Sequence, residues 1–306
     1  MTREHFLKLA AEYELGHVAN QLLSTAIPAA RVLKEGLRPG RRSDMTFLGG
    51  MPCPMPREWP HCEEVLLTFV GQVDTSSLPA GVCPVPLPVG ILQFFVPPTG
   101  KSHGYEPSLD LGRVIFVKSG PTEQQDSDPV PQTKRTKPAR SPSVFSPAFR
   151  FFRPCADVPT GASNLPHKPF PMLGFDWEVF PSLYASAPDR DALWLPETAQ
   201  PFDFNFGADE DNYFELRQAV LARHQSSLRA QMFGFPYALQ EDMEALVDAA
   251  SGNRSVNEFR EWILLFALDS SCGGLAPEAA CYYYWIHRDD LAEGSFEEVW
   301  LCIQQD

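Results

Sequence analysis

Apolar residues along this chain gather in short runs that end at turn-forming residues, which is the pattern of β-strands. Runs rich in apolar, β-branched and aromatic residues predict strands at 29–34, 65–73, 90–96, 113–118, 145–152, 175–180, 262–268 and 281–286. The last two runs are unbroken in their apolarity, which predicts strands covered on both faces. By contrast, the glycines and spaced prolines of 47–56 predict a stiff extended loop without regular structure.

Apolar residues at helical spacing occur in three places. Residues 3–25 place apolar side chains on one face of a predicted amphipathic helix. The longest predicted helix runs over 210–232. A shorter one at 240–250 carries Glu241 and Asp242 in its first turn, where the positive end of a helix favours acidic side chains.

One unit occurs twice in the sequence. An apolar run, an aspartate, hydroxyl residues, a loop and an aromatic run follow each other at 66–96 and again at 263–286. The aspartates are Asp74 and Asp269. A duplication explains this order more simply than chance does. The whole pattern predicts an α+β fold, with antiparallel sheets that contain the duplicated strand–Asp–loop–strand unit and a few helices packed against them.

Composition favours one folded domain over 1–306 with an insertion inside it. Hydrophobic residues make up 44% of the chain, which is enough for a buried core, and 30 prolines disfavour an all-helical fold. Between 119 and 147, Pro, Ser, Thr, Gln and Lys dominate. This stretch has too little apolar surface to offset chain entropy, so we expect a disordered loop. Its basic run at 134–140 is either a solvated linker or a nuclear-import signal.

Acidic charge is concentrated in the last third of the chain. Residues 201–306 carry 6 Lys+Arg and 19 Asp+Glu, within a net charge of −14. This argues against nucleic-acid binding, which needs clustered positive charge. It is typical of a solvated acidic surface, or of a docking face for a basic partner. No apolar run reaches the roughly 20 residues of a membrane span. Seven cysteines without a CxxC pair indicate reduced thiols, so we expect a cytoplasmic protein.

Several short motifs together resemble the YwqG-like family, a domain of unknown function. Among them are Leu-Gly-Gly-Met-Pro at 48–52, Phe-Val-Gly-Gln-Val-Asp at 69–74 and Phe-Gly-Phe-Pro at 233–236. Where the family usually has Trp-Gly-Asp, this chain has Gly-Gly-Leu-Ala-Pro at 273–277. The resemblance implies an α+β fold with antiparallel sheet and no established activity. The motif residues are Gly49, Gly50, Pro52, Trp59, Pro60, Gln72, Asp74, Gly234, Pro236, Gln240, Asp242, Trp262, Asp269 and Trp285.

Three carboxylates are the weak candidates for catalysis. Asp74, Asp269 and Asp242 could act as general acid and base, or hold a hard cation, if the fold brings them into one cleft. An aspartate before hydroxyl residues at a strand end is also typical of a turn cap, whose carboxylate accepts backbone N–H bonds. Capping explains Asp74 and Asp269 better.

Other candidate chemistry is weaker still. Four residues within 53–83 could bind zinc, but no knuckle spacing fixes them, and free thiols with a surface histidine explain them better: Cys53, His61, Cys62 and Cys83. The glycines at 49–50 lack the lysine of a phosphate loop, and we expect them to pack closely against Trp59. Trp59, Trp262 and the aromatic run 282–285 are interpreted as buried packing. We therefore expect no metal and no cofactor.

Nothing in the sequence forms a secure catalytic site. The leading hypothesis is a non-catalytic module that binds a protein, in one version an inhibitor-like or immunity-like protein that neutralises a basic partner through 201–306. The alternative is a hydrolase-type enzyme that uses Asp74, Asp269 and Asp242. The sequence indicates no nucleic-acid or membrane partner and leaves the oligomeric state open.

Overall fold

The computed structural model describes residues 1–39, 45–62, 64–98, 111–118, 170, 172–184, 208–222, 229–236, 247, 250–251, 261–269 and 280–304, without the side chains of 33–39. The chain divides into two units, 1–118 with 166–306 and 119–165, and all described residues belong to the first. Some predictions lie outside the described residues. They are the insertion at 119–147, the strand at 145–152, and the motif residues Gln240 and Asp242.

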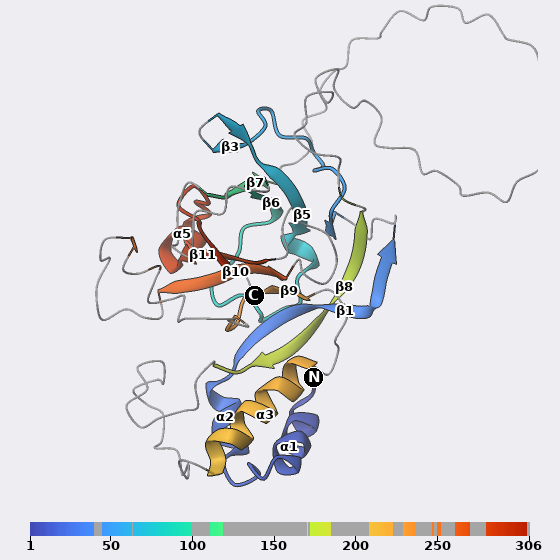
Figure 1. Cartoon of the computed structure of the whole chain (residues 1–306), viewed down its shortest axis with the longest axis vertical. Coiled ribbons are helices and arrows are strands. Elements are labelled where there is room, and N and C mark those ends of the chain that lie inside the picture. Colours follow the sequence, from blue (N-terminus) through green and yellow to red (C-terminus); the bar gives the residue numbers. More distant parts are fainter. Residues whose placement is uncertain are drawn as a thin grey trace, which may run out of the picture. The chain divides into compact units, whose positions relative to one another are not determined.

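Ten strands form one sheet in the order β12-β11-β10-β9-β1-β8-β2-β5-β6-β7, and every neighbouring pair is antiparallel (Figure 1). Its centre is the pair β1 (Ile27–Pro39) and β8 (Leu173–Ser182). The N-terminal arm consists of β2 (Phe47–Leu48), β5 (Thr68–Asp74), β6 (Gly90–Val96) and β7 (Arg113–Lys118). The C-terminal arm consists of β9 (Arg229–Met232), β10 (Trp262–Asp269), β11 (Cys281–His287) and β12 (Trp300–Gln304).

The remaining elements are small. Strands β3 (His61–Cys62) and β4 (Val65–Leu66) form a separate two-stranded sheet. The helices described with both their ends are α1 (Arg3–Glu12), α2 (Ala19–Thr25), α3 (Ala208–Ala222) and α5 (Arg288–Glu293), and a 3₁₀ turn, η1, spans Thr75–Ser77. The described part of the protein is therefore mostly β with a few helices. The predicted antiparallel sheet is confirmed, whereas the helices contribute less than the α+β prediction implies.

Three predicted elements need correction. The helix predicted over 3–25 is broken into α1 and α2, where Glu14 takes a positive φ of 59° that a helix cannot contain. The helix predicted over 210–232 is wrong at its end, because 229–232 form β9, paired with both β1 and β10. The loop predicted over 47–56 is wrong at its start, where β2 bridges β5 and β8. In each case long-range pairing or a local turn overrides the local pattern.

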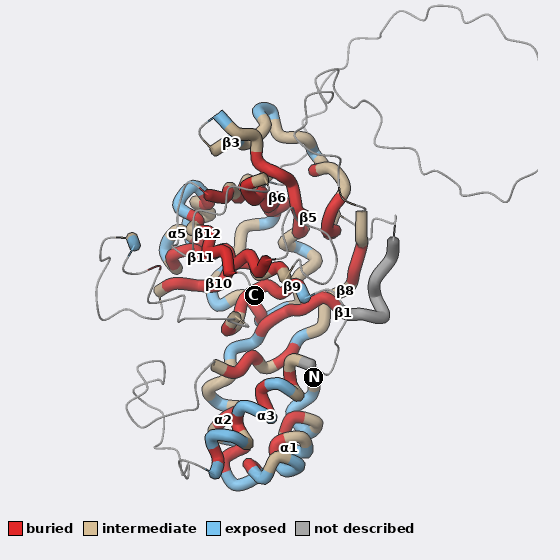
Figure 2. Tube along the Cα trace, in the orientation of Figure 1, coloured by how far each residue is buried: buried red, intermediate tan, exposed pale blue. Residues whose placement is uncertain are grey.

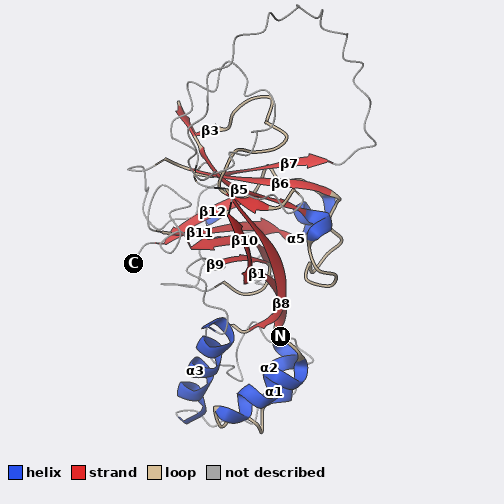
Figure 3. Cartoon of the chain, turned by 90° about the vertical axis from the view of Figure 1, so that its right-hand side faces the viewer, coloured by secondary structure: helices blue, strands red, loops and turns tan. Residues whose placement is uncertain are grey.

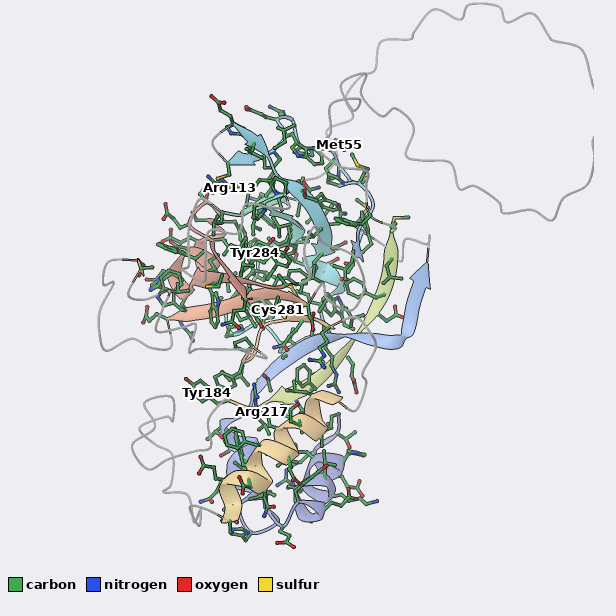
Figure 4. The ribbon with its side chains drawn as sticks, in the orientation of Figure 1. Met55, Arg113, Tyr184, Arg217, Cys281 and Tyr284 are labelled. Carbon is green, nitrogen blue, oxygen red and sulfur yellow. The ribbon has the colours of Figure 1, made fainter. Side chains whose placement is uncertain are left out.

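The sheet curls so that its two arms face each other across a shared core, and it nearly closes like a barrel (Figures 1 and 3). Phe94 of β6 stacks on Phe266 of β10, with ring centroids 4.4 Å apart. The hydroxyl of Tyr284 in β11 donates to the carbonyl of Phe95 at 3.1 Å, and Tyr284 lies among the core side chains in Figure 4. Burial raises the pKa of Tyr284 well above its ordinary value, so this hydroxyl stays a donor.

The two edges of the sheet also come close together. An ideal Cβ placed on Gly112, just before β7, would lie 2.7 Å from Leu301 Cδ2 in β12. Phe116 of β7 packs on Phe296, which precedes β12, with ring centroids 4.9 Å apart. A side chain at position 112 would have to displace Leu301, so glycine lets the two edges approach this closely.

Strands β10 and β11 are covered on both faces, as their unbroken apolar runs predict, and Figure 2 shows them mostly in the colour of buried residues. Every residue of β6 and β11 is buried. The inner face of the curl carries the shared core, and each outer face has its own cluster. On the N-terminal arm this outer cluster contains Phe47, Phe69 and Phe95, and on the C-terminal arm Trp262 and Trp285.

Helices α1, α2 and α3 pack against one end of the central pair. Phe6 of α1 and Leu216 of α3 are fully buried in a cluster with Phe180 of β8. Arg217 of α3 is only 7% exposed and donates to the carbonyl of Leu183, which follows β8 (Figure 4). This bond fixes α3 to the sheet by a polar contact as well as by apolar packing.

Candidate functional site

Asp74 stands at the end of β5 and caps the turn that follows. Its Oδ1 accepts the backbone N–H of Ser76 at 2.9 Å and the Ser76 hydroxyl at 2.7 Å. Its own N–H donates to Thr46 Oγ1 at 2.9 Å. This is the geometry that the capping interpretation predicts, and it gives the carboxylate a local structural role.

Asp269 stands at the end of β10, and its described partner is different. Its side chain is 11% exposed, and its Oδ2 lies 4.0 Å from a guanidinium nitrogen of Arg229 on the neighbouring strand β9. The residues predicted to receive its cap, Ser270 and Ser271, lie outside the described residues, as does Asp242. Asp74 and Asp269 therefore occupy similar strand ends, and the cap of Asp74 lies within the described residues.

Two buried glutamines hold the loop after β2. Gln72 is fully buried; its Nε2 donates to the carbonyls of Met45 and Cys53 at 2.8 and 2.9 Å, and its Oε1 accepts the Cys53 N–H at 2.8 Å. Gln93, its cross-strand partner, is also fully buried and donates to the Pro54 carbonyl at 2.7 Å. These bonds replace the backbone pairing that an irregular loop lacks.

The glycine turn after β2 and the one after β9 share their backbone conformation. Gly49 and Gly50 have φ of 65° and 69°, and Phe233 and Gly234 have φ of 59° and 72°. At Gly50 a Cβ would meet Met172, at 3.1 Å, so packing against Trp59 is not the reason for this glycine. The reasons for glycine here are the positive φ and the close approach of Met172.

Side-chain bonds also fix the second turn. Gln231 Nε2 donates to the carbonyls of Phe233 and Phe235 at 2.6 and 2.9 Å. The Pro236 carbonyl accepts from Arg217 at 3.2 Å. A Cβ on Gly234 would lie 2.6 Å from that of Ala29, so this position has room only for glycine.

The motif tryptophans differ in burial. Trp262 is 5% exposed and Trp285 is fully buried, as predicted. Trp59 is only half-buried, so the prediction of its burial is wrong. Its indole N–H donates to the Leu67 carbonyl at 2.7 Å, and its ring meets Phe95 edge-on at 5.5 Å. Trp59 thus lies across the outer cluster of its arm as a partly exposed cover. The neighbouring Pro60 carbonyl accepts the Leu67 N–H at 2.9 Å, and Pro52 is buried.

A cavity of about 370 Å³ lies within the loop between β5 and β6. Its walls come from 75–87, including Thr75, Leu78 and Cys83. Burial raises the pKa of the Cys83 thiol, so this residue is a weak nucleophile and a weak metal ligand at neutral pH. The cavity is therefore a feature of loop packing without groups that activate a substrate.

A run of carboxylates follows β11. We define the acidic face by Asp289, Asp290, Glu293, Glu297 and Glu298, which lie on α5 and in the turn before β12. Four of the five are exposed and Asp290 is partly exposed. Pro88 borders this face, since a Cβ on Gly294 would lie 3.1 Å from its ring. The next residue, Val89, is 59% exposed.

Helix α5 is absent from the elements predicted above, although its signals are present in the sequence. His287 is the N-cap, Asp289 and Asp290 fill the first turn, and Gly294 has the left-handed conformation that ends a helix. The helix has only six residues, too few to show a periodic apolar face. The caps were the signal that could have located it.

The comparisons with known proteins add the family. A family model described as a domain of unknown function, DUF1963, matches residues 46–304, which confirms the resemblance that the motifs indicate. None of the curated proteins matches the chain. Among the described helices, none has the length and apolarity needed to cross a bilayer.

Proposed function

The chain belongs to the DUF1963 family, and from this premise we propose that it is a protein-binding module that takes a basic partner on the acidic face. The observation that carries the proposal is the exposure of unpaired charge. Within the described residues, Glu293, Glu297 and Glu298 form no ion pair, and Asp289 has only His287 Nδ1, at 3.8 Å, near its carboxylate. Unpaired surface carboxylates attract a basic partner over several ångströms and accelerate its association.

An apolar edge supports the same function. Val89 is the most exposed large hydrophobic side chain of the described residues, and it follows Pro88 at the border of the acidic face. An interface usually combines a small apolar centre with a charged rim. The partner that fits best is a segment rich in Lys and Arg with one apolar anchor. A protein that covers such a segment acts as an inhibitor or immunity protein when the segment is needed for activity.

The hydrolase alternative has less support. Asp74 uses its Oδ1 on the turn it caps, and Asp269 lies beside Arg229. A general base must reach the proton that it abstracts, and an aspartate whose carboxylate caps its own turn is poorly placed for that.

We also propose that the two arms arose by duplication of a unit larger than the repeated sequence segment. In each arm the strands follow one another along the chain from the centre of the sheet to its edge: β2, β5, β6 and β7 in one arm, and β9, β10, β11 and β12 in the other. Strands at the same distance from an edge therefore correspond, and the central strands β1 and β8 form the fifth pair. Each arm has a register shift in its main hairpin, between Phe69 and Gly71 and between Leu264 and Phe266. Asp74 and Asp269 both end the first strand of that hairpin, which supports a shared structural origin.

The test is a matched pair of triple neutralisations. Glu293→Gln/Glu297→Gln/Glu298→Gln removes three charges from the acidic face. Glu210→Gln/Asp211→Asn/Glu215→Gln removes three from exposed positions of α3, which lie in the same acidic third of the chain. The probe is a labelled peptide of six Lys/Arg residues around one Leu, titrated by fluorescence anisotropy at low and physiological salt.

We expect the first variant to weaken peptide binding at least about fivefold and the α3 variant to change it less than about twofold. Equal losses in both variants would mean that the peptide senses only net charge, and no loss in either would mean that the acidic face is not used. Either result contradicts the proposal.

A further inference from the structure

Three chemistry-bearing side chains meet where β10 begins and β11 ends. Glu261 directly precedes β10, His287 is the last residue of β11, and Asp289 lies in α5. Their ligand atoms all lie within 4.8 Å of one another, and among the described residues no other group of three His, Cys, Asp or Glu side chains meets this condition. Cys53, His61, Cys62 and Cys83 are described but do not form such a group.

The backbone around these side chains is held firmly. His287 pairs with Trp262 in the β10–β11 ladder. The N–H of Arg288 donates to the carbonyl of Glu261 at 2.6 Å, so the two chain segments are joined on both sides of the histidine. The Trp262 ring meets the imidazole edge-on, with centroids 5.5 Å apart, and limits its rotation. The group is thus preorganised rather than carried by free loops.

One ring nitrogen of His287 is buried without a hydrogen bond. The residue is 5% exposed, and its Nδ1 accepts the backbone N–H of Asp289 at 3.4 Å. Its Nε2 is buried and lies 3.0 Å from Glu261 Oε2, but no hydrogen bond joins the two atoms. The distance allows an ion pair, whereas the direction is wrong for a hydrogen bond. A buried polar atom without a hydrogen bond is rare in folded proteins and indicates an absent partner.

We propose that Glu261, His287 and Asp289 bind a first-row divalent transition-metal ion. An ion about 2.0–2.2 Å from both Nε2 and Oε2 would see these atoms at roughly 90°, because they are 3.0 Å apart. That angle suits two adjacent ligands of a five- or six-coordinate ion. The Asp289 carboxylate lies nearest the other ring nitrogen, with Oδ2 3.8 Å from Nδ1, and its side chain is 76% exposed, so it rotates toward Nε2 to supply the third ligand. Water or a side chain of a bound partner completes the coordination.

The donor set selects the class of ion. One imidazole with two carboxylates suits Zn²⁺ and its first-row neighbours, whereas Ca²⁺ and Mg²⁺ prefer oxygen ligands alone. This departs from the sequence-based expectation of no metal, which considered the thiol-containing group and the three aspartates but not Glu261 and His287. Glu261 and His287 are 26 residues apart, beyond the reach of a short-motif search. The inference does not depend on the proposed peptide binding.

The experiment measures metal binding to the whole chain without any peptide. Zn²⁺ is titrated calorimetrically under reducing conditions, and Co²⁺ is added in parallel because its visible spectrum distinguishes nitrogen and oxygen ligands from thiolates. The variants are Asp289→Asn, Glu261→Gln and His287→Ala. The matched control is Glu298→Gln, which removes one charge from the acidic face outside the group.

We expect wild type and Glu298→Gln to bind one Zn²⁺ with the same affinity, and each ligand variant to bind at least about tenfold more weakly. The Co²⁺ spectrum should lack thiolate bands. If His287→Ala fails to fold, Asp289→Asn decides the question, because its side chain is exposed. Unchanged affinity in Asp289→Asn and Glu261→Gln, thiolate bands in the Co²⁺ spectrum, or no binding at about 100 μM Zn²⁺ would each overturn the proposal.

Discussion

The N-terminal and C-terminal arms share a backbone plan and differ in the side chains that hold it. Both have a main hairpin with a register shift, and both follow a short strand with two consecutive residues of positive φ. In the N-terminal arm, Gln72 and Gln93 are fully buried and bind the loop after β2. In the described part of the C-terminal arm, Gln231 binds the turn after β9.

The outer faces of the two arms also differ in the side chains that cover them. The N-terminal arm is covered by the half-buried Trp59 and the loop that contains it, whereas the C-terminal arm buries Trp262 and Trp285. The first arm therefore adds polar bonds to an irregular loop, and the second buries its tryptophans more deeply. One backbone arrangement can thus be stabilised by different side-chain chemistry. Substitutions at matching places in the two arms should therefore lower the free energy of unfolding by different amounts.

The largest effect is expected for the two tryptophans. Trp262→Ala should lower the free energy of unfolding by about 3–5 kcal/mol, the range for truncating a buried aromatic residue. Trp59→Ala should cost about half as much, because its ring is partly in water already. Urea unfolding followed by circular dichroism measures both. Equal losses would show that the cover over the N-terminal arm is as well packed as the core of the other.

The glutamines should give the next largest difference. Gln72→Leu leaves three backbone groups of Met45 and Cys53 without their partner and should cost about 3 kcal/mol. Gln231→Leu leaves two carbonyls and should cost about 2 kcal/mol. Thermal unfolding of the two variants, with Gln72→Glu as an isosteric control, tests the order. A neutral Gln72→Leu would show that water takes over the bonds.

The glycine turns should separate by a smaller margin. Gly234→Ala combines a positive φ with a Cβ only 2.6 Å from that of Ala29, and should cost about 2–3 kcal/mol. Gly50→Ala meets Met172 at 3.1 Å and should cost about 1–2 kcal/mol. Melting temperatures of both variants check this. The reverse order would mean that Met172 cannot yield and that the packing around Ala29 can.

The smallest effect concerns the two aspartates. Asp74→Ala should cost about 0.5–2 kcal/mol through loss of a cap, and Asp74→Asn less, because the amide oxygen can still accept. The pair of Asp269 with Arg229 should itself contribute under about 1 kcal/mol, since it is long and partly exposed, and Asp269→Asn tests this. Differential scanning calorimetry with and without Mg²⁺ is the measurement. A stability gain in Asp74→Asn, or a metal effect lost in it, would contradict capping.

The sequence predicts the strands of both arms because each needs only a local apolar run. The runs at 262–268 and 281–286 become β10 and β11, buried on both faces. The motifs that indicate the family are also local, because they lie in strands and in the turns beside them, and the family model confirms them. The cap on Asp74 is also local, because its partner Ser76 is two residues away.

What the sequence fails to predict depends on contacts between distant residues. The end of the helix predicted over 210–232 becomes β9 because β1 and β10 supply hydrogen bonds on both sides. Gln72 reaches Cys53, 19 residues away, and nothing near Gln72 indicates that bond. His287 and Glu261 meet only because the β10–β11 hairpin aligns them. The position of Trp59 ahead of a repeated strand predicts burial, but the ring lies at the rim of a cluster that is already filled by three phenylalanines.

The close approach of β7 and β12 has a consequence for the solubility of the protein. A strand at a sheet edge exposes unpaired N–H and C=O groups that can join the edge of another molecule and start aggregation. Here each edge lies against the other, with Leu301 placed over Gly112 and Phe116 over Phe296. An incoming strand would have to displace this apolar contact before it could pair. A larger side chain at position 112 should therefore increase aggregation at high protein concentration. Its effect on the free energy of unfolding of the monomer should be the smaller of the two changes.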